Sequence, residues 1–455
     1  MRKIKQWTAM SLAAVMAMSL TACGGGGSTG GATTAAATDG TTAAAGETTA
    51  SGEQVELTFS WWGGDSRHAA TEEAIKAFEE KYPNIKVTPE YGAWTGWEEK
   101  QSLNILGGNS ADVMQINWNW IESYSKGGTA FANLEDYSDA LDLTQFTPES
   151  LELCKEDGKL MAVPIAMTGR VFYWNKTAFE EVGVDIPTDL DSLYAAGEAF
   201  QAKDPDMYPL ALGEYDRTIL MVYYLESKYG KNWVEDGKVN YTEEEVKDGM
   251  DFITSLEEKH VIPTIATIQG DMADSIDKNA KWIDGKYAGI FEWDSAASKF
   301  KSALEGSVNK PGQEFAVGEF VKMGDYNGGF TKISMGFAVS ASSKHPKEAA
   351  MLINFLLNEE EGVKITSTER GIPCSTAGLK ILEENNLGDP LTIEANTKVM
   401  NYSKFVLDTK FEHNDLKANP DGVYYKVFGK LSAGEIDSTQ AAQELIKGVT
   451  ETLEG

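Results

Sequence analysis

The chain has 455 residues, of which 42% are hydrophobic and 10% aromatic, so it is long enough for a large core and usually for more than one lobe. Its formal net charge of −30 argues against nucleic acid as a partner. The net charge does not determine the charge of a small ligand, because the electrostatic potential at a binding site can be opposite in sign to that of the whole protein.

The chain begins with the pattern of a signal peptide. Arg2, Lys3 and Lys5 precede an apolar run over residues 9–20, which is shorter than the roughly 20 residues that span a bilayer. The run ends in Leu20-Thr21-Ala22-Cys23, which resembles the bacterial lipobox. That resemblance implies that residues 1–22 are removed and that Cys23 carries acyl chains, palmitate among them, which anchor the mature protein in a membrane. An ordinary secretory signal with a chance cysteine is the alternative.

A low-complexity segment follows over residues 23–53. It is almost wholly Gly, Ala, Ser and Thr, with Asp39 and Glu47 as its only charges, so it is unable to bury a core. We interpret it as a flexible linker between the lipid anchor and the folded part. Its run Gly24–Gly27 lacks the preceding strand, the following helix and the Lys of a phosphate-binding loop.

The folded part starts at residue 54 with alternating Val55, Leu57 and Phe59, which predict a strand that ends near Trp62. Helical and extended patterns then alternate along the chain: a helix over 71–82, a strand from 85, a helix over 97–106 and a strand over 111–116. This order predicts a parallel sheet covered by helices. Ligands of such sheets bind beyond the carboxyl ends of the strands.

Aromatic and hydrogen-bonding residues follow three successive predicted strands. Trp side chains among Asn, Asp and Arg suit a ligand with apolar C–H faces and a rim of hydroxyls, so we predict a sugar. In the alternative interpretation, an individual Trp of this set packs in the core and does not contact ligand. The set comprises Trp61, Trp62, Asp65, Ser66, Arg67 and His68 after the first strand, Tyr91, Trp94 and Trp97 after the second, and Asn117, Trp118, Asn119 and Trp120 after the third.

Seven segments, in this order, resemble the carbohydrate-binding lipoproteins of bacterial ABC importers, the extracellular solute-binding family that includes the maltodextrin-binding proteins. The resemblance covers the chain from about residue 54 to its end. The segments are WWGGDSRH (61–68), AIKAFEEKYPNIKV (74–87), ADVMQINWNW (111–120), DGKLMAVPIAMTGRVFYWNK (157–176), GKYAGIFEWDSAA (285–297), GGFTKISMGFAVSASSKHPKEAAMLINFLL (328–357) and RGIPCS (370–375).

The resemblance implies an α/β, periplasmic-binding-protein-like fold with two α/β lobes joined by crossing hinge strands. By this comparison the first lobe comprises residues 54–168 and 320–370, and the second comprises 169–319 and 371–455. The crossings are expected at 157–176, 315–321 and 371–373. The sugar would bind in the cleft between the lobes, which close on it.

The same comparison implies the ligand-binding residues. Trp293, followed by Asp294, matches the tryptophan of the second lobe that stacks on a sugar ring. A loop with Asp65 and Arg67 would offer charged groups to sugar hydroxyls, and Arg170 and Tyr173 would face the cleft from the first crossing. The full predicted set is Trp62, Asp65, Arg67, Trp94, Trp97, Asn117, Trp118, Trp120, Arg170, Tyr173, Trp293, Asp294 and Lys332.

The charge of the predicted sugar stays open at this stage. Arg67, Arg170 and Lys332 map near the cleft and would pair with uronate carboxylates. The region through the third strand also resembles the oligogalacturonide-binding branch more than the maltodextrin branch. Each cation has a structural alternative as a cap, a hinge ion pair or a solvated side chain. We therefore favour a neutral oligosaccharide and keep a uronate-containing one as the alternative.

The function implied is that of a monomeric, non-enzymatic substrate-binding subunit, which hands an oligosaccharide to the transmembrane permease of an ABC importer. It would work on the outer face of the cell membrane of a bacterium with a single membrane. An extracellular glycoside hydrolase or lyase is the main alternative, and capture of a non-sugar solute is a second. We expect no cofactor and no metal, since neither the four His nor the cysteines have metal-ligand spacing. Cys154 and Cys374 are expected to be free and buried, with a disulfide as the alternative.

Overall fold

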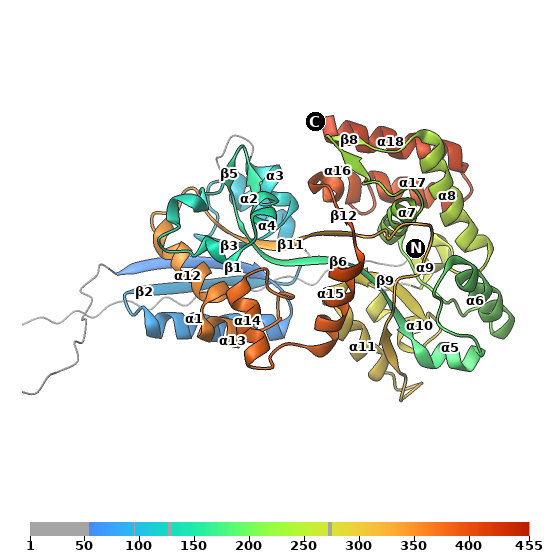
Figure 1. Ribbon diagram of the computed structural model, residues 1–455, viewed down its shortest axis with the longest axis horizontal. Coiled ribbons are helices and arrows are strands. Elements are labelled where there is room, and N and C mark those ends of the chain that lie inside the picture. The colour runs from blue at the N-terminus through green and yellow to red at the C-terminus, as the bar shows by residue number, and fades with distance from the viewer. Residues whose placement is uncertain (1–53, 95, 126–129, 272–274, 455) are drawn as a thin grey trace, which may run out of the picture. The chain divides into compact units, whose positions relative to one another are not determined.

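The computed structural model describes residues 54–94, 96–125, 130–271 and 275–454 (Figure 1). The predicted signal peptide, Cys23 and the linker lie outside the described residues. The fold is α/β, as predicted. Its strands are β1 (Val55–Trp62), β2 (Ile85–Gly92), β3 (Val113–Asn117), β4 (Lys155–Glu156), β5 (Lys159–Leu160), β6 (Val163–Asn175), β7 (Val234–Glu235), β8 (Lys238–Val239), β9 (Gly289–Trp293), β10 (Phe315–Val317), β11 (Phe330–Val339) and β12 (Phe405–Val406).

Helices account for most of the remaining described chain. The α-helices are α1 (Asp65–Lys81), α2 (Trp97–Leu106), α3 (Asn119–Ser125), α4 (Pro148–Glu152), α5 (Lys176–Val182), α6 (Leu190–Lys203), α7 (Glu214–Tyr229), α8 (Glu243–Glu258), α9 (Ile265–Gly270), α10 (Ala280–Ile283), α11 (Ala297–Glu305), α12 (Pro346–Asn358), α13 (Glu360–Thr366), α14 (Thr376–Glu384), α15 (Pro390–Tyr402), α16 (Asn414–Lys417), α17 (Val423–Ser432) and α18 (Ser438–Glu454). Short 3₁₀ helices are η1 (Leu134–Tyr137), η2 (Leu143–Gln145), η3 (Ile276–Lys278), η4 (Asp294–Ala296) and η5 (Thr409–Glu412).

The first part of the sheet has the predicted strand–helix–strand order. β1 pairs in parallel with β2 on one side and with β3 on the other. The alternating residues Val55, Leu57, Phe59 and Trp61 of β1 are all buried, so the alternation of the sequence identified the strand correctly. The carboxyl ends of these strands, where ligands of parallel sheets bind, therefore lie at one edge.

Two long antiparallel strands connect this part to the rest of the molecule. β6 and β11 pair from Val163 with Phe337 to Gly169 with Thr331. β11 also pairs with β3, whereas the second half of β6 pairs with β9 and β10. The sheet order is β10-β6-β11-β3-β1-β2, with β9 on β6 and β12 on β11.

Helices complete the two ends of this sheet. α1 and α12 pack on the strands of the first part, and α13 packs against both helices. At the other end α7 packs on β9, and α8, α17 and α18 form a further layer against α7 and against one another. Helices thus cover both ends of the sheet on either side of the paired strands β6 and β11.

Two predicted features differ from the structure. The helix predicted at 71–82 begins at Asp65, because a polar and Ala-containing segment, capped at Gly64, extends it without any apolar periodicity. Asp65 and Arg67 therefore lie in the first turns of α1, not in a loop. The segment 315–321 forms β10 on the β9 side of the sheet, so the strand that returns is β11, at 330–339.

Cys154 and Cys374 are both free. Cys154 is fully buried and Cys374 is partly buried beside the backbone of β6, where its amide donates to the Ile165 carbonyl at 2.9 Å. Burial raises the pKa of the Cys374 thiol to about 12, so it stays protonated at neutral pH.

Gly169 marks the closest approach of the paired strands. A Cβ at this position would lie 2.5 Å from the Phe330 carbonyl oxygen and 2.5 Å from a methyl group of Val399. We expect Gly169→Ala to lower the free energy of unfolding by about 1–3 kcal/mol through this overpacking, as measured by urea denaturation. Gly429→Ala in α17, where no atom lies within 4 Å of the added Cβ, is the matched control and should not destabilise. Equal losses in both variants would contradict this account of Gly169.

Candidate functional site

A pocket of about 340 Å³ lies where the carboxyl ends of β1, β2 and β3 face residues of β9, β11 and η5. We call it the central pocket. It contains aromatic rings, hydroxyl and amide groups, and three charged side chains. Its lining residues are Trp62, Trp94, Asn117, Thr168, Tyr215, Trp293, Ser295, Lys332, Ser334, Met335, Glu412 and Lys417.

Trp62 and Trp94 form the aromatic wall on the β1–β3 side. Their ring centroids lie 5.0 Å apart at an interplanar angle of 57°, and Trp94 is 40% exposed. Trp62 ends β1 and Trp94 follows β2, so the parallel pairing of these strands brings the two rings together. Exposed aromatic surface at the mouth of a pocket suits the apolar face of a sugar ring.

Arg67 holds the backbone of Trp62 in place. Its Nη1 donates to the Trp62 carbonyl at 3.1 Å and its Nε to the Glu369 carbonyl at 2.9 Å, while Gln115 Nε2 donates to the same Trp62 carbonyl at 3.2 Å. Burial lowers the pKa of Arg67 to about 10. Arg67 is therefore a positioning residue and does not line the pocket, and Asp65 points into solvent at the start of α1.

Three predicted tryptophans belong to the core and do not line the central pocket. Trp97, Trp118 and Trp120 are each less than 5% exposed. Trp118 Nε1 donates to the Leu153 carbonyl at 3.0 Å, and Trp120 Nε1 donates to Glu98 at 2.9 Å. These rings pack into the core at the starts of two helices: Trp97 is the first residue of α2, and Trp118 and Trp120 lie on either side of the first residue of α3.

Trp293 forms the opposite aromatic wall. It ends β9, and its ring centroid lies 4.5 Å from Arg170 Cζ and 4.6 Å from Lys332 Nζ, both within cation–π range. The Tyr173 hydroxyl lies 2.8 Å from the Trp293 carbonyl and 3.0 Å from the Asp294 carbonyl. Arg170 and Tyr173 are buried, so they support Trp293 from behind instead of facing the ligand as predicted.

Arg170 is held through its Nη1 by three partners, whereas its buried Nε has no hydrogen-bond partner among the described residues. Its Nη1 lies 2.9 Å from Asp216, 3.0 Å from Glu292 and 2.7 Å from the Phe291 carbonyl oxygen. Burial opposes the charged form, but Glu292 and Asp216 outweigh it and raise the pKa of Arg170. This cation is therefore buried beneath Trp293 and does not line the central pocket.

Asp294 joins three elements behind the pocket. It accepts hydrogen bonds from the Thr168 hydroxyl of β6 and from Asn396 Nδ2 of α15, the latter at 2.7 Å. Burial raises its pKa to about 6, although both hydrogen bonds favour the ionised form. Asp294 is thus a buried structural carboxylate next to the pocket and not one of its lining residues.

The charged residues of the pocket, Lys332, Glu412 and Lys417, form what we call its charged floor, of which the sequence predicted only Lys332. Lys332 and Glu412 form a buried ion pair, the Tyr215 hydroxyl donates to Glu412 at 2.9 Å, and Lys417 Nζ lies 3.6 Å from Glu412. Burial would raise the pKa of Glu412, but Lys332 and Lys417 hold it well below its usual range. Burial, Lys417 and Arg170 together lower the pKa of Lys332 against the opposing effect of Glu412.

A bulge in β11 explains why neighbouring residues share the pocket. The register with β6 shifts between Ile333 and Met335, so Ser334 is the extra residue. Side chains of a regular strand alternate, and Lys332 and Ser334 would then face away from Met335. With the bulge, Lys332 lies opposite Thr168 and Met335 lies opposite Asn117, and all of these residues line the pocket.

The sequence thus identified Trp62, Trp94, Asn117, Trp293 and Lys332 among the lining residues. It missed Tyr215, Glu412 and Lys417, which come from α7, η5 and α16 and carry no local pattern. It also missed Thr168, Ser295, Ser334 and Met335. These four residues lie close in sequence to predicted site residues on β6, η4 and β11, and this closeness could have identified them.

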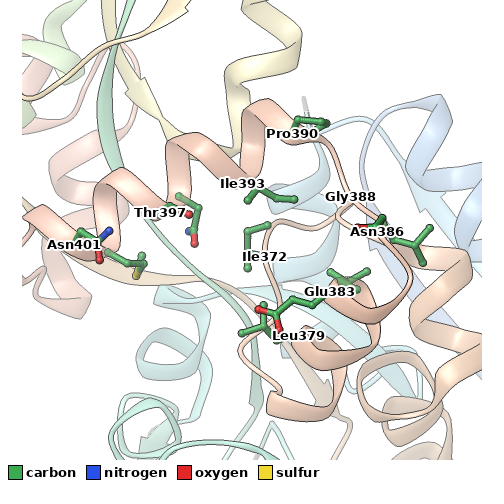
Figure 2. Close-up of a pocket in the computed structure, with 13 residues that line it drawn as sticks. Ile372, Leu379, Glu383, Asn386, Gly388, Pro390, Ile393, Thr397 and Asn401 are labelled. Atoms are coloured by element: carbon green, nitrogen blue, oxygen red, sulfur yellow. The ribbon is translucent and has the colours of Figure 1, made fainter.

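A larger cavity of about 710 Å³ lies between α14 and α15 (Figure 2). Apolar side chains, including Leu379, Leu382, Ile393 and Met400, form much of its lining. None of the described residues that line it is aromatic or basic. It offers neither a stacking surface nor a cation, so the smaller central pocket is the better candidate for a saccharide site.

Comparison with known proteins identifies the family. Residues 64–363 match the model of the family described as bacterial extracellular solute-binding protein. The chain belongs to this family. A solute-binding protein from Pectobacterium atrosepticum is similar in structure, with a TM-score of 0.81 and 32% identity over 88% of this chain and 99% of that chain. An oligogalacturonide-binding protein from Yersinia enterocolitica, solved with saturated digalacturonic acid, has a TM-score of 0.80 and 29% identity with the same coverage.

Curated relatives of this solute-binding protein match over shorter stretches. A putative binding protein of Brucella abortus is 30% identical over 161 residues, which is 35% of this chain and 39% of that protein. A xylose/arabinose-binding protein of Haloferax volcanii is 28% identical over 280 residues, which is 56% of this chain and 57% of that protein. The matched region therefore spans less than two thirds of these relatives.

The buried Asp294 makes stability depend on pH in a defined direction. An acid whose pKa is raised from 3.8 to about 6 by folding destabilises the folded protein as pH rises through that window. We expect the unfolding free energy of the wild type, relative to Asp294→Asn, to fall by about 3 kcal/mol between about pH 3.5 and about pH 7. Urea denaturation of both proteins at several pH values measures this difference, and a constant difference would contradict the raised pKa.

Proposed function

We propose that the protein is the substrate-binding subunit of an ABC importer, which captures an oligosaccharide in the central pocket and delivers it to the membrane permease. The observation that carries the proposal is the pair of aromatic walls. Trp62 and Trp94 come from one side of the paired strands and Trp293 from the other, with hydroxyl, amide and charged groups between them. This arrangement suits sugar rings, and the family membership supports transport.

We further propose that closure of two lobes traps the ligand. In place of the limits expected from the sequence, the first lobe comprises residues 54–168 and 335–384, and the second comprises 169–334 and 390–454. Two observations support these limits: β11 pairs with β3 only from Met335 onward, and α14 packs on α12 and α13, whereas α15 packs on β6 and η4. A permease then selects the loaded receptor if ligand binds the closed state better.

The proposed location is the outer face of a membrane, through a lipid on Cys23 and the linker 23–53. The family description as extracellular supports the location, and the lipobox resemblance supports the anchor. In the part of the chain that the structure describes, no helix has the length and apolar character to cross a membrane. The proposed receptor acts as a monomer.

The charges of the pocket favour binding over hydrolysis. Glycoside hydrolysis commonly uses two carboxyl groups, one of them an acid with a raised pKa. Among the described residues that line the pocket, Glu412 is the one carboxylate, and its pKa is lowered by Lys332 and Lys417. We therefore propose that the ligand leaves the protein uncleaved, which chromatography of an oligosaccharide after prolonged incubation tests.

We also propose that the ligand carries a carboxylate. Lys332 and Lys417 line the pocket with Glu412, so these three side chains leave one positive charge in excess. A uronate carboxylate would neutralise this charge through a charge-assisted hydrogen bond. The similar protein from Yersinia enterocolitica was solved with digalacturonic acid, which agrees with this choice over a neutral sugar.

Removing the Trp293 ring tests the binding site itself. We expect Trp293→Ala to weaken oligosaccharide binding by about 10- to 100-fold, or about 1.4–2.8 kcal/mol, because the stacking surface is lost. Isothermal titration calorimetry with the best ligand from a panel of neutral and acidic oligosaccharides measures the change. A thermal melt checks that the variant is folded. Unchanged affinity in a folded variant would remove Trp293 from the site.

Removing the Lys417 charge tests the proposed carboxylate. We expect Lys417→Met to weaken binding of a uronate-containing oligosaccharide by about tenfold, while a neutral one of equal length loses less than twofold. Lys447→Met in α18 is the matched control, because it removes the same charge from an exposed position that does not line the pocket. Equal effects on both ligands would contradict uronate recognition by Lys417.

A further inference from the structure

A second pocket, of about 590 Å³, adjoins the central pocket. We call it the side pocket. It shares Trp94 and Lys417 with the central pocket, and it is bounded by Glu98, Glu99 and Leu103 of α2 and by Asn414 of α16. A ligand longer than the central pocket would extend along Trp94 into this space.

Trp94 is placed to contact sugar units in both pockets. It is 40% exposed, and its one ring contact among the described residues is with Trp62. Leu103, which is 73% exposed, adds apolar surface on the side-pocket wall. Aromatic and apolar surface beside hydrogen-bonding groups is the pattern that suits a further sugar ring.

The two pockets differ in charge. The central pocket has the lysines Lys332 and Lys417 with the single carboxylate Glu412, whereas the side pocket has the carboxylates Glu98 and Glu99 with the shared Lys417. Glu98 and Glu99 lie in the first turn of α2, whose dipole supplies only about half a positive charge. Together with Lys417, this partial charge reduces the charge of the two carboxylates, so that the side pocket keeps a small net negative charge.

One of the two side-pocket carboxylates, Glu98, is held in place by a buried donor. Glu98 accepts a hydrogen bond from Trp120 Nε1 at 2.9 Å, and Trp120 is buried. Glu98 is partly buried and Glu99 is exposed. Sugar hydroxyls can donate to such carboxylates, while a ligand carboxylate in the same place is repelled.

We propose that the ligand is an oligosaccharide of mixed charge, with one uronate unit in the central pocket and neutral units in the side pocket. The proposal rests on the proposed function, and it adds which units carry the charge. The lysines of the central pocket select the acidic unit, and Glu98 and Glu99 reject a second one. A uniformly acidic oligosaccharide is therefore a poorer ligand than one with a single carboxylate.

The test uses trisaccharides that differ only in the number of carboxylates. They are a neutral galactose trisaccharide, the same trisaccharide with one galacturonate unit, and trigalacturonate, with a parallel glucose and glucuronate series. Calorimetry on the purified protein should show the singly acidic member binding at least tenfold more tightly than the other two in the preferred series. Equal or tighter binding of the uniformly acidic member overturns the mixed-charge inference and leaves the proposed function standing. Binding of no member of either series overturns the proposed function.

A double variant tests the assigned residues independently of the sugar. We expect Glu98→Gln with Glu99→Gln to raise the affinity for the uniformly acidic trisaccharide about tenfold relative to that for the singly acidic one, whatever the lost hydroxyl contacts do to both. Gln at position 98 keeps an acceptor for Trp120. The matched control is Glu243→Gln with Glu244→Gln, which removes two adjacent carboxylates from the first turn of another helix, α8. No selective gain in the first variant, or the same gain in the control, overturns the proposal.

Discussion

The antiparallel pairing of β6 with β11 is the constraint on which the site depends. These two strands join the β1–β3 part of the sheet to β9 and β10, and they also carry Thr168, Lys332, Ser334 and Met335 into the central pocket. Because the backbone ladder sets the register, it fixes which side chains of the two strands lie opposite one another. In a regular strand, Lys332 and Ser334 would share one face and Met335 would lie on the other. The bulge at Ser334 brings Met335 to the pocket as well.

Buried charged side chains hold the Trp293 wall of the pocket in place. Arg170 lies under Trp293 with Asp216 and Glu292, and Lys332 reaches the same ring while it pairs with Glu412. Burying such groups has a desolvation cost that only good geometry and added hydrogen bonds offset. The cost is consistent with a site in which the stacking ring must not move, since a ring that is already ordered loses less entropy on binding.

The sequence predicted the local elements well and the site in part. β1 and α2 follow from short-range periodicity, and the end of β1 locates Trp62 directly. Trp118 and Trp120 lie in the core and not in the lining of the central pocket, because the turn into α3, and not the strand before it, decides where these rings point. The Lys332–Glu412 pair joins residues 80 positions apart on different elements. No periodicity within either segment contains that information, so the charged floor became visible only in the structure.

The chain's overall charge and the charge of its pocket act over different distances. A net charge of −30 would repel an anionic ligand from far away, but salt screens this effect beyond about 8 Å under physiological conditions. Within the pocket, Lys332 and Lys417 act at contact distance and partly out of solvent, where screening is weak. For the proposed acidic sugar, the global charge would therefore slow the approach more than it would weaken the bound state. Selection of the ligand then depends on a few side chains whose charges are fixed in position by the fold.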